Sequence, residues 1–159
     1  MQEISLRGAA ATARLARSLA GRLTGRELLL LEGDLGAGKT TFVRHLAEAL
    51  GIEPAWVSSP SFTLVQRYPA GRAGFGLAHA DLYRLPPGSD LEPLGLEDLL
   101  SGPDLVVVEW PAAGEALGRE CGRPVVRIRL QVTGASSRRA ILQEPNGRIG
   151  ESAKGRRRS

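Results

Sequence analysis

The apolar residues of this 159-residue chain fall into runs of two kinds. Residues 28–31 (LLLL) and 105–109 (LVVVE) hold short, almost uninterrupted apolar runs, which are typical of strands in a parallel sheet covered on both faces. Residues 9–23 and 40–50 place apolar side chains at helical spacing, and a glycine stands within two residues of each end. Strands and helices that alternate in this way predict an α/β fold.

The remaining patterns predict shorter elements. Two β-favouring runs separated by PAGRAG suit an antiparallel hairpin. Further along, valine, isoleucine and leucine alternate with arginine, as in a strand with one buried face. In chain order, these patterns predict strands at residues 3–6, 62–68, 75–83, 125–132 and 139–143, and helices at residues 96–100 and 112–117.

Charge divides the chain near residue 134. Residues 1–134 carry fourteen Lys and Arg against fifteen Asp and Glu, whereas residues 135–159 carry seven against two, and the difference gives the net charge of +4. We therefore expect a nearly neutral domain at 1–134, followed at 135–159 by a short strand and a basic, disordered tail. The tail either acts as a solubilising segment or contacts the phosphate backbone of a nucleic acid without reading its sequence.

Cysteine content and hydropathy bear on the compartment. The single Cys121 cannot form an internal disulfide, which fits a reducing environment. Residues 1–23 lack the uninterrupted apolar core of a signal peptide, because arginines recur within them. No apolar stretch approaches the roughly 18 residues of a membrane span. We expect a cytoplasmic protein with no membrane partner.

Residues 33–40 (GDLGAGKT) match the pattern G-x-x-x-x-G-K-[ST] between a predicted strand and a predicted helix, which is the setting of a phosphate-binding loop. Glycines let the main chain approach the phosphates, and the N–H groups of the loop and of the first helical turn hold the anion. Lys39 is expected to reach the β and γ phosphates, and the Thr40 hydroxyl to ligate Mg²⁺. The residues expected to bind the nucleotide are Gly33, Asp34, Leu35, Gly36, Ala37, Gly38, Lys39, Thr40 and Thr41.

Two acids are candidates for positioning a metal ion or the attacking water. Glu109 ends an apolar run, and the carboxyl ends of parallel strands are where such sheets bind ligands, so its carboxylate could hold Mg²⁺. Asp81 lies in HADLYR, where alternation puts His79, Asp81 and Tyr83 on one face, and it could orient water. The pattern alone fits a solvent-facing strand residue equally well for each acid, and it favours a structural hydrogen bond for His79.

Five motifs occur in the following order along the chain: GDLGAGKTTFVR at 33–44, VSSPSFTLVQRY at 57–68, HADLYRL at 79–85, GLEDLL at 95–100 and VVVEWP at 106–111. Together they resemble the TsaE family, the small P-loop ATPases of bacterial tRNA threonylcarbamoyladenosine synthesis. The resemblance implies a three-layer α/β/α P-loop NTPase fold with a mixed, mainly parallel central sheet. It also implies ATP hydrolysis that supports modification of the adenosine next to the anticodon, with TsaB and TsaD as partners and the transferase site on TsaD.

Matched motif by motif, the resemblance assigns Thr40 and Glu109 to Mg²⁺ and makes Asp81 essential for hydrolysis. It also implies that residues 58–63 form a mobile, switch-like segment and that Trp110 lies close to the site. The chain departs from the family pattern after EWP, where it reads PAAGE and only Glu115 could replace the usual acid. The Arg-rich tail also continues past the usual end.

The resulting hypothesis is an ATPase in which Lys39, Asp81 and Glu109 are catalytic and ATP with Mg²⁺ lies on residues 33–41. A small-molecule kinase is one alternative, although it needs an acceptor pocket and usually an Arg-bearing lid. An assembly factor that senses the nucleotide, with incidental hydrolysis, is another. A GTPase with the base-reading N-K-x-D motif is excluded, because the only lysines are Lys39 and Lys154.

Overall fold

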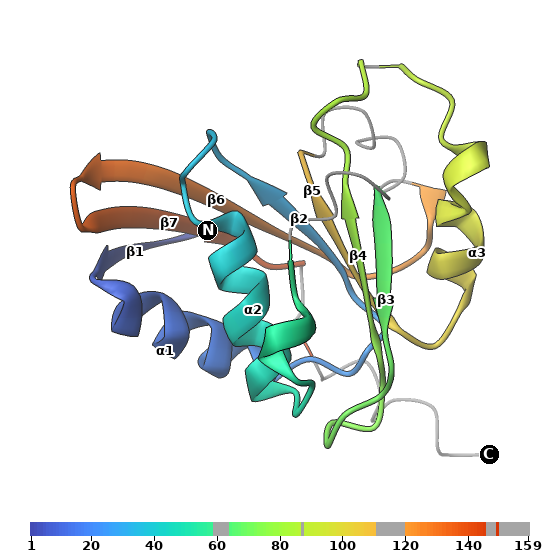
Figure 1. The fold of residues 1–159 in the computed structure, drawn as a ribbon, viewed down its shortest axis with the longest axis horizontal. Helices are drawn as coiled ribbons and strands as arrows, with labels where there is room; N and C mark the ends of the chain where they lie inside the picture. Colours follow the sequence, from blue (N-terminus) through green and yellow to red (C-terminus); the bar gives the residue numbers. More distant parts are fainter. Residues whose placement is uncertain (59–63, 87, 111–119, 146–148, 150–159) are drawn as a thin grey trace.

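The computed structural model describes residues 1–58, 64–86, 88–110, 120–145 and 149. Its elements, shown in Figure 1, are β1 (Gln2–Arg7), α1 (Ala9–Ala20), β2 (Leu28–Glu32), α2 (Lys39–Ala49), the 3₁₀ turn η1 (Pro54–Trp56), β3 (Val65–Tyr68), β4 (Leu77–Asp81), the 3₁₀ turn η2 (Glu92–Leu94), α3 (Leu96–Ser101), β5 (Leu105–Glu109), β6 (Val125–Gly134) and β7 (Ser137–Gln143). No helix among the described residues is long and apolar enough to cross a membrane.

The described strands form one seven-stranded sheet in the order β1-β7-β6-β2-β5-β4-β3 (Figure 1). β2 pairs in parallel with both β5 and β6, and β4 pairs in parallel with β5. β7 runs antiparallel to β1 and β6, and β3 runs antiparallel to β4. All the described strands except β3 and β7 therefore share one direction, which confirms the predicted mixed and mainly parallel sheet.

Side chains of β2 alternate between two hydrophobic cores. Leu29 and Leu31 belong to the core that contains the buried faces of α1 and α2, whereas Leu28 and Leu30 pack in the core that contains the leucines of α3. All four leucines are fully buried, which explains why the run has no polar interruption. Helices thus cover both faces of the sheet (Figure 1), and the three predicted layers are confirmed.

The predicted hairpin is confirmed by the antiparallel pairing of β3 with β4. β4 begins at Leu77, two residues later than predicted, because Phe75 still belongs to the bend before it. The strand predicted at residues 139–143 is β7, which lies between β1 and β6, so the sheet continues beyond residue 134. The helix predicted at residues 112–117 lies outside the described residues.

The topology gathers the candidate site at one edge of the sheet. Because β2, β4 and β5 are parallel, their carboxyl ends meet there. The loop after β2 leads directly into α2, whose first residue is Lys39. Asp81 and Glu109 are the last residues of β4 and β5.

Candidate active site

The loop between β2 and α2 depends on glycines in backbone conformations that other residues rarely adopt. Gly33 has φ of 146°, and a Cβ added there would lie 2.5 Å from the carbonyl oxygen of Leu130 in β6. Gly36 and Gly38 have φ of 77° and 100°, and Gly38 is the N-cap of α2. The loop therefore keeps its main chain uncovered at the N-terminus of an 11-residue helix, where unpaired N–H groups favour an anion.

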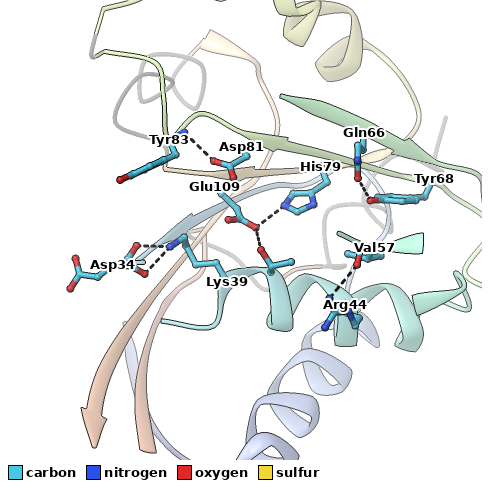
Figure 2. A network of polar contacts seen from close by, with 12 residues as sticks. Asp34, Lys39, Arg44, Val57, Gln66, Tyr68, His79, Asp81, Tyr83 and Glu109 are labelled. Carbon is cyan, nitrogen blue, oxygen red and sulfur yellow. Dashed lines mark hydrogen bonds and ion pairs between the residues drawn. The ribbon is translucent and has the colours of Figure 1, made fainter. Parts of the chain in front are cut away.

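Lys39 brings a positive charge into this loop. Its side chain is 5% exposed, and its ammonium group donates hydrogen bonds to the carbonyl oxygens of Gly33, at 2.7 Å, and Asp34, at 3.0 Å (Figure 2). Burial lowers the pKa of Lys39, although the charges of Glu109, Asp81 and Asp34 oppose that shift. An incoming polyphosphate would add negative charge beside this partly desolvated ammonium group and favour its charged form.

Glu109 lies beside the first turn of α2. The Thr40 hydroxyl donates to Glu109 Oε1 at 3.3 Å, and the Glu109 residue is 2% exposed. The alternative of a solvent-facing glutamate at the strand end is therefore wrong. A hydroxyl and a carboxylate are hard oxygen ligands of the kind that Mg²⁺ prefers, so these two residues fit the ion.

The residues that the structure describes do not supply a full set of ligands for a metal ion. Residues 1–58, 64–86, 88–110, 120–145 and 149 contain no group of three or more His, Cys, Asp and Glu side chains placed to hold an ion. Mg²⁺ in nucleotide sites is usually held by one or two carboxylate or hydroxyl oxygens together with phosphate and water. Thr40 and Glu109 match that incomplete type of site.

Asp81 is brought to the same place by strand pairing. It is the register partner of Glu109 across the parallel pair β4 and β5, and it is 7% exposed. Its Oδ1 accepts a hydrogen bond from the backbone N–H of Tyr83 at 3.0 Å (Figure 2). The alternative of a solvent-facing hairpin strand is wrong here, because every residue of β4 is buried.

His79 is the nearest side-chain partner of Glu109. Its Nε2 lies 2.8 Å from Glu109 Oε1, and the residue is fully buried (Figure 2). The sequence favoured a structural hydrogen bond for His79, and this is what the structure contains. The identity of its partner could not be deduced from spacing, since Glu109 is 30 residues away on another strand.

Two aromatic rings border the site. Tyr83 and Trp110 pack with ring centroids 4.8 Å apart, and the Lys39 ammonium lies 3.8 Å from the centroid of the Trp110 ring. Trp110 has φ of 59°, an uncommon value for a residue with a side chain. The sequence placed Trp110 near the site only through a family resemblance, and its backbone conformation had no sequence signal.

A pocket of about 440 Å³ joins these groups. Lys39, Thr40, Asp81 and Glu109 line it together with Tyr83 and Trp110. Among the residues predicted to bind nucleotide, Leu35, Gly36, Gly38, Lys39, Thr40 and Thr41 border the pocket. Leu64 and Arg84 also border it, and the sequence analysis did not assign either residue to the site. Residues 59–63, Glu115 and residues 150–159, on which further predictions fall, lie outside the described residues.

Comparison with known proteins gives a consistent match over most of the chain. The family described as "Threonylcarbamoyl adenosine biosynthesis protein TsaE" matches residues 6–141. The tRNA threonylcarbamoyladenosine biosynthesis protein TsaE of Streptomyces coelicolor is 42% identical over 117 residues, which are 73% of this chain and 76% of that protein. The protein of the same name from Rickettsia felis is 35% identical over 127 residues, covering 80% of this chain and 71% of that protein.

A solved structure is similar in fold. The crystal structure of YdiB from Bacillus subtilis superimposes with a TM-score of 0.67 at 27% sequence identity. The match covers 91% of this chain and 86% of that chain. The overall fold is therefore similar to that of a known protein over most of the chain.

Proposed function

The chain belongs to the TsaE family, and we propose that it supports threonylcarbamoyladenosine synthesis in tRNA as a Mg²⁺-dependent ATPase. The family and its curated relatives support the role in this modification. The ATPase part of the proposal depends on the geometry of the pocket. We further propose that the chain acts in the cytoplasm.

The contact between Thr40 and Glu109 carries the proposal. Thr40 follows the loop lysine, and Glu109 ends the strand next to the loop strand, so a hydroxyl and a carboxylate meet beside the phosphate cradle at 3.3 Å. A loop that only bound an anion would not need a buried carboxylate next to it, because a negative charge there opposes anion binding. A metal ion between the carboxylate and the bound anion would remove this repulsion.

Each of the main residues that line the site then has a proposed role. The loop amides and the Lys39 ammonium hold the phosphates and stabilise the charge that develops on the transferred phosphoryl group. Thr40 and Glu109 would hold Mg²⁺, which when bound offsets the charge on the β and γ phosphates. Asp81, which is buried next to Glu109, orients the attacking water.

We propose TsaB and TsaD as the partners in this function, because one small ATPase offers no product besides ADP and phosphate. ATP turnover would then reset a complex whose transferase site lies on TsaD. Low activity of the isolated chain is expected if the partner completes the pocket, where the lining residue Tyr83 is itself 50% exposed.

Reconstitution of tRNA modification with TsaB and TsaD tests the proposal. Modification and phosphate release should both require this chain, and Glu109→Gln should abolish both. Phosphate transfer to a small acceptor would instead support a kinase. Full modification by Glu109→Gln at saturating ATP would contradict hydrolysis and favour a factor that only senses the nucleotide.

A further inference from the structure

His79 occupies a place that an apolar residue would ordinarily take. It is 0% exposed in the middle of β4, between Ala78 and Ala80, which are both buried. β4 itself lies inside the sheet between β3 and β5. A polar ring in such a position is costly unless its nitrogens have hydrogen-bond partners.

Only one of the two ring nitrogens has a partner in the described structure. Nε2 lies 2.8 Å from Glu109 Oε1, and with the carboxylate oxygen as the acceptor the hydrogen is assigned to Nε2. Nδ1 is buried and has no hydrogen-bond partner among the described residues. The imidazole therefore leaves one nitrogen unsatisfied in the core, and its contact with Glu109 is the gain that offsets this cost.

The same carboxylate oxygen is held from two sides. The Thr40 hydroxyl reaches Glu109 Oε1 from α2 at 3.3 Å, and His79 Nε2 reaches it from β4 at 2.8 Å. Figure 2 shows the Glu109 carboxylate next to the His79 ring, with Lys39 on the other side. Two donors on Oε1 restrict rotation of the carboxylate and leave Oε2 outside this pair of contacts.

We propose that His79 is a positioning residue for the metal site: its Nε2–H holds the Glu109 carboxylate in the orientation that binds Mg²⁺ together with the nucleotide. The inference rests on the proposed function, in which Glu109 holds the ion. Hydrogen bonds that orient a metal-binding side chain typically change metal affinity 10–100-fold when they are removed. His79 would contribute in this way without touching ATP or the ion.

Three substitutions separate positioning from packing. His79→Leu fills the space without a donor. His79→Gln carries an amide nitrogen that can reach the place of Nε2, whereas His79→Asn has the same amide but reaches only to the place of Nδ1. Gln and Asn are therefore a matched pair that differs in reach. Melting curves of the full-length variants show which of them fold.

The measurement is Mg²⁺ affinity at a fixed, saturating concentration of ATP, with ATP affinity in EDTA as the control. We expect His79→Leu and His79→Asn to weaken Mg²⁺ binding about 10–100-fold, with ATP affinity in EDTA unchanged and most of the loss recovered in His79→Gln. Unchanged Mg²⁺ affinity in a folded His79→Leu or His79→Asn protein would overturn the proposal, and so would an equal loss of ATP affinity in EDTA.

A double-mutant cycle tests whether His79 acts through Glu109. In a Glu109→Gln background, His79→Asn should weaken Mg²⁺ binding no further, and a full additional loss would overturn the proposal. Failure of the proposed function would give a different result from failure of the His79 proposal. In that case, the unmodified protein itself would show no Mg²⁺-dependent ATP binding.

Discussion

Asp81 and Glu109 are register partners at the last residues of the parallel strands β4 and β5, and both are almost fully buried. Two carboxylates side by side at one edge of a sheet repel each other, so their placement is unfavourable without a cation. The Lys39 ammonium lies near both acids, and burial lowers its pKa although the charges of Glu109 and Asp81 oppose that shift. The two acids are therefore already side by side in the absence of any ligand.

Removing either acid should separate binding from turnover. Asp81→Asn keeps an oxygen that can accept the hydrogen bond from the Tyr83 N–H, and Glu109→Gln keeps the side-chain volume. At saturating Mg²⁺ we expect ATP affinity within about threefold of the unmodified protein, and a loss of turnover of about 10²-fold or more. Phosphate release measured with the partner complex checks this, and an active Glu109→Gln variant would place the metal acid elsewhere.

Lys39 should matter more for binding than for stability. Burial disfavours its ammonium, but the carbonyl oxygens of Gly33 and Asp34 and the charges of Asp81 and Glu109 favour it, so Lys39→Met should change the melting temperature of the nucleotide-free protein little. ATP with Mg²⁺ at about 100 times its Kd should raise the melting temperature of the unmodified protein by roughly 5–10 °C. The Lys39→Met variant should lose that shift, and a retained shift would show that Lys39 does not bind the nucleotide.

Gly33 and Gly36 provide a matched pair within the loop. A Cβ at position 33 would lie 2.5 Å from the Leu130 carbonyl oxygen, whereas a Cβ at position 36 would meet no heavy atom within 4 Å. Both have positive φ, so Gly36→Ala should cost about 1–2 kcal/mol of unfolding free energy from backbone strain. Gly33→Ala should cost distinctly more, because the clash adds to the strain. Urea unfolding measures the difference, and equal losses would contradict the close packing of the loop against β6.

Arg123 lies at the opposite end of the sheet and has a structural task. Its guanidinium donates to the backbone carbonyl oxygens of Leu100 and Asp104, each at 2.7 Å, and to that of Leu99 at 3.2 Å. These carbonyls belong to the end of α3 and to the loop before β5. One side chain thus joins α3, the start of β5 and the segment that leads into β6.

Loss of these bonds should affect stability and leave the pocket intact. Arg123→Met would leave several carbonyls without donors, and we expect it to lower the unfolding free energy by about 3 kcal/mol. Arg123→Lys, which retains the charge but fewer donors, should lose less. ATP affinity of both folded variants should match that of the unmodified protein, and a changed affinity would mean that this end of the sheet is coupled to the site.

The glycine-rich loop between β2 and α2 could be predicted from the sequence because its pattern is local. Its glycines, Lys39 and Thr40 follow one another within eight positions, and a strand and a helix flank them. The buried run at residues 28–31 was equally clear, since strands covered on both faces usually read as nearly continuous apolar runs.

The roles of the acids could not be settled from the sequence. Whether Asp81 faces solvent or the interior depends on what covers that face of β4, which is a tertiary property that alternation along one strand does not contain. The contact of His79 with Glu109 joins two strands, and the six carbonyl contacts of Arg123 join several segments, so neither has a local signature.

The most direct test is equilibrium dialysis of the full chain against labelled ATP in excess Mg²⁺, with Lys39→Met as the control. Saturable uptake approaching one ATP per chain, lost in the variant, is the predicted result. If the folded chain retained no ATP above the level of the variant, either alone or with TsaB and TsaD, the loop between β2 and α2 would not be a nucleotide site and the proposed ATPase would be contradicted.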